Sequence, residues 1–172
     1  MLKLWKQDEE LISEFCSKTG VEKYDLKHCN ALKKIELLNL QKIKSVSIFI
    51  SHNQCVKIQA STLEHLAYFG DSKESTVLDV VECRNLKSLE LSHVKISEVM
   101  EPFISGSEFL ESLTLDRVSK GLGRFNICEK QLLKDLKIKE CKGIGEIDAP
   151  NSVSLEYTTN QIPEQFKCCV VL

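Results

Sequence analysis

An apolar triplet of the form L-x-x-L-x-L, in which x is any residue, recurs along this chain at a nearly constant interval. The three clearest copies begin at Leu86, Leu110 and Leu133. Four weaker copies begin at Val21, Ile43, Leu63 and Ser152. Successive starts are therefore separated by about 22 positions, within the range typical of leucine-rich repeats. A period in this range restricts the chain to an architecture in which successive repeats stack on one another.

Each triplet ends in an apolar-polar-apolar alternation, which is typical of a short strand with one buried face. One such strand cannot bury its apolar face alone, so neighbouring repeats must stack into a continuous core. The sequence therefore predicts a β-rich α/β leucine-rich-repeat solenoid. Its short parallel strands would line a concave face, and irregular or extended return segments would form the convex face.

The segments between the triplets repeat as well. Val118–Phe125 aligns with Cys141–Ile147, because the same offset separates Gly121 from Gly143 and Phe125 from Ile147. Val56-x-Ile58-x-Ala60 and Val80-Val81-x-Cys83 resemble the same element in earlier repeats. We therefore expect a short extended piece in each return segment. Only Ser97–Gly106 is expected to hold a helical turn, with Pro102 early in it.

The two ends of the chain break the period. Leu11, Ile12 and Phe15 have helical spacing and are followed by Gly20, which predicts an amphipathic helical cap over residues 1–20. A cap is expected because a terminal repeat otherwise exposes its core. The solenoid, of about seven turns, is then expected over residues 21–160, and a C-terminal tail over 161–172.

Composition narrows the function classes. The 172 residues, 42% of them hydrophobic and 28% charged, suit one globular domain. A net charge of −2 argues against a dedicated nucleic-acid binder. The first residues lack the apolar region of a secretory signal, and no stretch has the length needed to span a bilayer. Eight cysteines in such a chain indicate reduced thiols, and a cytoplasmic or nuclear location is expected.

Residues that suggest chemistry have structural interpretations. Cys29 and Cys141 each closely follow a strand, at a position that is Asn or Cys in leucine-rich repeats, so we expect them inside turns, as well as Cys83 and Cys128 on return segments. The four histidines are scattered without metal spacing, and the glycine pairs lack the rest of a phosphate loop. We expect no catalytic residues, no metal site and no cofactor, and thus no enzyme.

Polar residues between and beside the leucines of the triplets remain as candidates for function. We expect a partner-binding strip of mixed charge made of Glu90, His93, Thr114, Asp116, Arg117, Lys137, Lys139 and Glu156. The alternative interpretation is a solvated sheet face on which cross-strand pairs such as Lys137 with Glu156 add a little stability.

The last four residues, Cys169-Val-Val-Leu172, match the C-a-a-X pattern, in which a final Leu directs geranylgeranylation. Cys169 would then carry a lipid, and the protein would be membrane-peripheral. The alternative interpretation is an apolar end left by truncation of the chain.

The residues of the later repeats are more specific for a protein family than the repeat period is. Phe109–Val118, Leu133–Cys141 and Ile147–Tyr157 resemble the repeats of plant F-box/leucine-rich-repeat proteins, above all in Ile-Asp-Ala-Pro-Asn followed by Leu-Glu-Tyr. The resemblance is good over residues 86–160, looser over 21–85 and absent before 20.

The resemblance implies the substrate-binding repeat region of an intracellular ubiquitin-ligase component, with a protein partner that is ubiquitinated. The chain begins without the Leu-Pro-rich F-box that binds the ligase adaptor, so the resemblance covers only the substrate-receptor half. Three alternatives stay open. They are a prenylated membrane-peripheral adaptor, the repeat tail of a plant immune receptor, and a truncated family member without an independent role.

Overall fold

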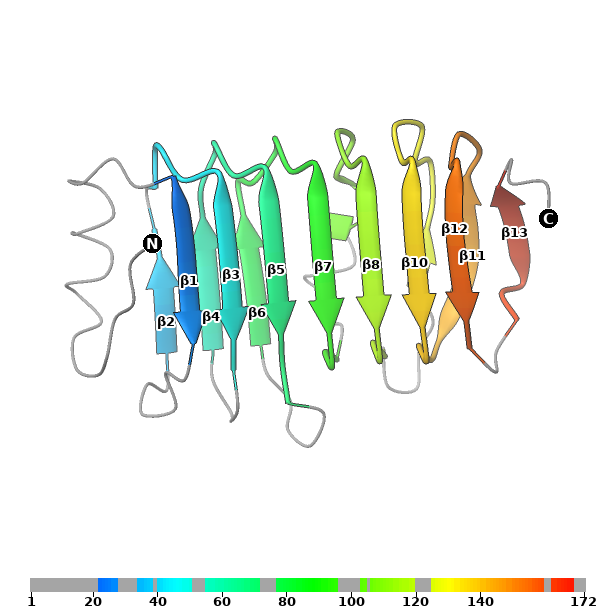
Figure 1. Cartoon of the computed structure of the whole chain (residues 1–172), viewed down its shortest axis with the longest axis horizontal. Helices are drawn as coiled ribbons and strands as arrows, with labels where there is room; N and C mark the ends of the chain where they lie inside the picture. Colours follow the sequence, from blue (N-terminus) through cyan, green and yellow to red (C-terminus); the bar gives the residue numbers. More distant parts are fainter. Residues whose placement is uncertain are drawn as a thin grey trace.

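The computed structural model describes residues 22–27, 34–38, 40–50, 55–71, 77–95, 103–104, 106–119, 125–159 and 162–168. The predicted cap over residues 1–20 lies outside these ranges, as do Cys29 and Cys169. Figure 1 shows two layers of strands that run across the long axis of the molecule.

The front layer is a single parallel sheet of seven strands, and each of them is one of the predicted triplets. In chain order and in sheet order these are β1 (Lys23–Lys27), β3 (Ser45–Phe49), β5 (His65–Phe69), β7 (Ser88–Ser92), β8 (Ser112–Asp116), β10 (Asp135–Lys139) and β12 (Ser154–Thr158).

The register of the front sheet equals the spacing of the triplets in the sequence. At one end of the sheet Lys23 pairs with Ser45, and at the other end Asp135 pairs with Ser154. The four intermediate pairings also align each triplet with the next one along the chain. The register follows because a slip of one residue would turn every leucine of a strand to solvent.

The back layer consists of two three-stranded parallel sheets. One contains β2 (Lys34–Leu37), β4 (Cys55–Gln59) and β6 (Val77–Val81), and the other contains β9 (Phe125–Ile127), β11 (Ile144–Ala149) and β13 (Gln165–Cys168). The return segments are thus extended, as expected, but these six are regular strands and not irregular chain.

One predicted alignment in the back layer is wrong. Phe125 pairs with Ile144 and Ile127 pairs with Ile147, so Phe125 and Ile147 are not equivalent. The register shifts between Ile144 and Ile147, because one strand carries an extra residue there. A constant offset therefore cannot describe this pair of strands.

The core lies between the two layers. On the front strands the second and fourth residues point inward, and on β8 these are Leu113 and Leu115, both fully buried. The back strands supply the opposite wall, as Ile35 and Leu37 do on β2 and Ile147 does on β11. Burial of leucine and isoleucine at every level of the stack is the main favourable contribution to folding.

The structure bears on further expectations from the sequence. Phe103, Ile104 and Gly106 are helical, within the segment expected to hold a helical turn. Residues 165–168, placed in the expected tail, instead form β13 and extend the back layer through pairing with β11. The front strands lie side by side in one row in Figure 1, and we call the surface that they form the front face.

Candidate partner-binding surface

The predicted strip residues gather on one half of the front face. Glu90, Thr114, Lys137 and Glu156 occupy the middle positions of β7, β8, β10 and β12 and lie opposite one another in register. Adjacent strands are roughly 4.8 Å apart, so these four side chains form a row about 14 Å long. The sheet fixes their spacing, which gives a partner a preformed set of polar contacts.

The expected charge pair on this row is not the one that forms. Lys139 Nζ lies 2.9 Å from Glu156 Oε1, a diagonal contact, and Lys137 makes no ion pair within the described part of the chain. Lys137 is exposed, so its ammonium group remains available to a partner.

Three further strip residues meet two neighbours outside the strip where β7, β8 and β10 end. We define the corner cluster as Ser92, His93, Asp116, Arg117 and Glu140. Arg117 is its centre, since its Nε donates to Glu140 Oε2 at 2.7 Å, and its Nη1 lies 3.3 Å from His93 Nε2 and 3.5 Å from Asp116 Oδ2. The two carboxylates raise the pKa of the Arg117 guanidinium, first through the hydrogen bond to Glu140.

Ser92 connects His93 and Asp116 within this network. Its Oγ lies 2.9 Å from His93 Nδ1 and donates to Asp116 Oδ2 at 3.3 Å. Because Nε2 of His93 faces the Arg117 donor, the network assigns the His93 proton to Nδ1, which donates to Ser92. The side chains form a closed ring of hydrogen bonds, which fixes the direction of the Arg117 guanidinium; its members are Ser92, His93, Asp116 and Arg117.

The backbone explains why these side chains converge. His93, Arg117 and Glu140 have φ angles of 56°, 52° and 47°, in the left-handed region. This conformation turns the chain sharply after each strand and lets the next residue, such as Val118, enter the core. Each of these three residues costs free energy of folding because of its left-handed conformation. The hydrogen bonds between the side chains of the corner cluster offset part of this cost.

An open groove of about 960 Å³ adjoins the cluster on the side of β12. Arg117 and Glu140 belong to both, and the groove is otherwise lined by Val118, Ser119, Cys141, Lys142, Tyr157, Thr158 and Thr159. The hydroxyl groups, the lysine and the tyrosine of this lining suit a mixed polar contact with a partner.

A second group of face residues was missed in the sequence. Phe49 and Phe69 stack with ring centroids 4.4 Å apart and an interplanar angle of 5°, and Lys27 Nζ lies 4.9 Å from the Phe49 centroid. All three are the last residues of β1, β3 and β5, and this register is the signal that identifies them. The Lys27 ammonium group and the two stacked rings stabilise the half of the front face that β1, β3 and β5 form.

A ladder of alternating charge, also missed, precedes the front strands. We call the residues just before β3, β5, β7, β8 and β10 the charge ladder: Lys44, Glu64, Lys87, Glu111 and Lys134. Lys87 Nζ lies 2.8 Å from Glu64 Oε2, and Lys134 Nζ lies 2.7 Å from Glu111 Oε2. Hydrogen bonds from Lys87 and Lys134 lower the pKa values of Glu64 and Glu111, respectively. Four of the five ladder charges are thus paired within the chain, which leaves the partner surface to the strip and the corner cluster.

The described cysteines agree with the structural interpretation to different degrees. Cys141 is buried, and its Sγ lies 3.3 Å from the carbonyl oxygens of Leu115 and Lys139. Cys83 is also buried, and desolvation raises its pKa to about 11. Cys128 is only half-buried, although desolvation and nearby carboxylates raise its pKa too.

Comparison of the chain with protein-family models, with curated proteins and with solved structures gives no match. Within the described ranges, no helix is long and apolar enough to cross a membrane.

Proposed function

We propose that the protein is a non-enzymatic protein-recognition module that binds its partner through the strip and the corner cluster. The observation that carries the proposal is the Arg117 network, which holds a guanidinium group in place through Glu140, His93 and Asp116. A side chain that is ordered before binding loses less entropy when a partner docks, and arginine is enriched among residues that dominate interfaces.

The strand spacing supports the same proposal. Glu90, Thr114 and Lys137 present an acid, a hydroxyl and a base at successive steps of the sheet. This fixed row of acidic, hydroxyl and basic side chains favours a partner whose charges have the complementary order. Partners with another order of charges are repelled.

At a finer level, we propose that the solenoid is of the leucine-rich-repeat kind and serves as the substrate-binding region of an F-box-type ubiquitin ligase component. The resemblance of residues 86–160 to plant F-box/leucine-rich-repeat proteins supports this role. The partner would then be a protein that is ubiquitinated.

Affinity capture with matched variants tests the general proposal. The variant Glu90→Lys/Lys137→Glu reverses two charges of the strip, and the control Lys57→Glu reverses one on the back face, where Lys57 lies on β4. A discrete partner should be retained by the wild type and the control and lost by the strip variant. Capture of the same protein by all three would contradict the proposed surface.

A further inference from the structure

The two ends of the front sheet differ in burial. At the β1 end, the inward residues Tyr24 and Leu26 are each 2% exposed. At the β12 end, the equivalent residues Leu155 and Tyr157 are only half-buried, although they pack against the same core. The core is therefore incompletely covered at the β12 end.

The back layer extends one strand further than the front layer at this end. β13 pairs with β11 beyond the level of β12, and Figure 1 shows β13 at the right-hand end with no front strand over it. Phe166 of β13 is in register with Ile147, which is fully buried, so Phe166 faces the front layer. It is nevertheless 42% exposed, and among the described residues Tyr157 makes an edge-to-face contact with it, with the ring centroids 5.7 Å apart.

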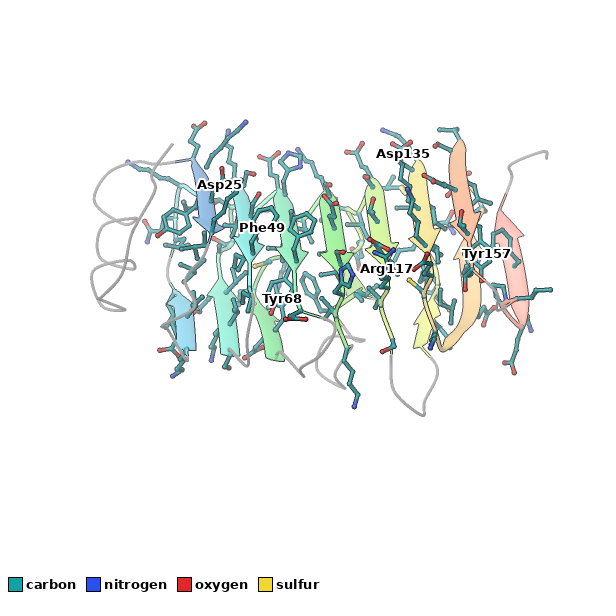
Figure 2. All side chains as sticks on the ribbon, turned by 60° about the horizontal axis from the view of Figure 1, so that its bottom comes forward. Asp25, Phe49, Tyr68, Arg117, Asp135 and Tyr157 are labelled. Carbon is teal, nitrogen blue, oxygen red and sulfur yellow. The ribbon has the colours of Figure 1, made fainter. Side chains whose placement is uncertain are left out.

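The outer edge of β12 and the inner face of β13 thus meet at an angle. We call this surface the step, and its inward-facing residues are Leu155, Tyr157 and Phe166. Within the described part of the chain, β12 pairs only with β10, so its outer backbone groups line the step. Figure 2 shows Tyr157 at the angle between the two strands. A strand added at this edge would lie roughly 4.8 Å from β12, the usual distance between neighbouring strands of a sheet.

We propose that this step binds one extended segment of a partner protein as an eighth, parallel front strand. The proposal rests on the protein-recognition function and names the chemistry of the segment. Main-chain hydrogen bonds to β12 would provide affinity, and alternate side chains would provide specificity, as in other cases of strand addition to a sheet edge.

The neighbours of the step define the residues of that segment. Its inward side chains contact Leu155, Tyr157 and Phe166, so they must be apolar at alternate positions. The residue between them lies beside Glu156 on the front face, and a Lys or Arg there would share this carboxylate with Lys139, which contacts its Oε1. The residue at the level of the charge ladder lies beside Val153, which is 77% exposed, and so needs no charge. The expected pattern is therefore apolar, basic, apolar at the levels of Leu155, Glu156 and Tyr157, with any residue at the two levels before them.

A second copy of the chain fits the step less well. Head-to-tail stacking would place Asp25 of β1, the middle residue of that strand, beside Glu156, and two carboxylates opposite each other repel. Direct pairing of β12 with its own copy is hindered by the two projecting β13 strands. These conflicts favour a single strand from another protein.

A synthetic peptide provides the test, since β10 already shows which sequence fits beside β12. We would titrate the full-length chain with a fluorescent peptide of the sequence of residues 132–140 and measure anisotropy. Lys137 stands opposite Glu156 in the native sheet, so the peptide carries the required basic residue. Saturable binding and slower exchange of the β12 amides are expected, whereas no saturation up to about 1 mM peptide would overturn the proposal.

Matched changes show whether binding uses the step. Proline at the peptide position equivalent to Lys137 removes one N–H and should abolish binding. The variant Glu156→Lys should weaken the lysine peptide about fivefold and prefer a peptide with Glu at that position. Phe166→Ser should weaken both peptides, with the melting temperature of each variant as a control for folding. Equal affinity of the wild type for the lysine and glutamate peptides would contradict the assigned register.

Two other occupants are outcomes that would overturn the proposal. Sedimentation of a dimer that the peptide dissociates would show that a second copy fills the step. Peptide binding that appears only after removal of residues 169–172 would show that the chain's own end fills it. Partner capture that still depends on Glu90 and Lys137, in a protein that binds no peptide, would refute only the step and leave the proposed function standing.

Discussion

At the scale of single residues, left-handed backbone conformations connect the fold to the candidate surface. His93, Arg117 and Glu140 adopt them at the ends of front strands, where the turn brings their side chains together. Glu82 and Glu129 adopt them as well, with φ of 59° and 56°, but they lie outside the corner cluster. At these two positions the backbone requires the turn and the side chain takes no part in the proposed site, so the cost of the conformation can be measured separately.

Substitution at Glu129 tests this cost. Because an L side chain is disfavoured in the left-handed region, Glu129→Gly should be more stable than Glu129→Ala by about 1 kcal/mol. Glu108 is the control, since it is also exposed and in a turn but lacks a positive φ, and there Ala should be at least as stable as Gly. Urea unfolding of the four variants measures both differences. The same order at both positions would contradict the role of the backbone.

Thiol chemistry gives a second test at this scale. Burial raises the pKa of Cys83 to about 11, so at pH 8 very little of it is thiolate. Cys83 should therefore react slowly with iodoacetamide in the folded protein and at an ordinary rate in urea, which peptide mass spectrometry can quantify. Since the folded pKa lies above the unfolded one, near 9, the contribution of this thiol to stability is complete below pH 9 and is lost as the pH rises toward 11. Fast native labelling of Cys83 at pH 8 would contradict its burial.

At the scale of elements, the predictability of a strand depended on how regular its spacing is. The front strands were predicted with their register, because each triplet buries two residues and fixes its own alignment. The equal offset of the two glycine pairs and of Phe125 and Ile147 predicted a wrong alignment of β9 with β11. The register of these strands shifts between Ile144 and Ile147. The Arg117 ring and the Phe49–Phe69 stack join side chains from different repeats, which are distant in the sequence, so only the assembled register reveals them. For the strip, the sequence identified the positions but paired Glu156 with the wrong lysine.

The charge ladder supports a prediction about salt. Lys87 lies between Glu64 and Glu111, so Lys87→Glu places three carboxylates in a row and should lower the urea midpoint of unfolding. The loss should shrink between about 0.1 M and 1 M NaCl, because these groups are exposed and salt screens them. Lys42→Glu, an exposed lysine outside the ladder, is the control and should change the midpoint little. A loss that is independent of salt would assign the effect of Lys87 to packing of its side chain instead.

The same ladder predicts a response to acid. The pKa values of Glu64 and Glu111 are lowered in the folded chain, so their contribution to stability is present above pH 4.5 and is lost as the pH falls through the folded values. Lys87→Met should reduce this loss, because Lys87 provides the largest cause of the shift at Glu64. Unfolding curves between pH 7 and pH 3 compare the two proteins. Parallel curves for wild type and variant would show that the ladder does not contribute.

At the scale of the whole molecule, the chain is a one-dimensional stack in which each level contacts only its neighbours. Every described pairing joins successive levels of one layer, and among the described strands β12 pairs only with β10 and β13 only with β11. Stability in such a stack is nearly a sum of the levels and their contacts, so levels at an open end should unfold at lower free energy than levels in the middle. The step at β12 and β13 is then the part of the molecule most responsive to a bound strand.

Equivalent leucines allow this gradient to be measured with one kind of substitution. Leu113 and Leu155 occupy the second position of β8 and β12, and Leu113 is fully buried whereas Leu155 is not. Leu113→Ala removes packing on both sides and should cost about 2–5 kcal/mol in the free energy of unfolding, while Leu155→Ala should cost much less because its site is partly solvated. Urea unfolding of both variants, with and without the peptide of residues 132–140, also links the stack to the step. The peptide should stabilise the wild type more than Leu155→Ala, since the alanine variant has lost part of the wall against which the added strand packs.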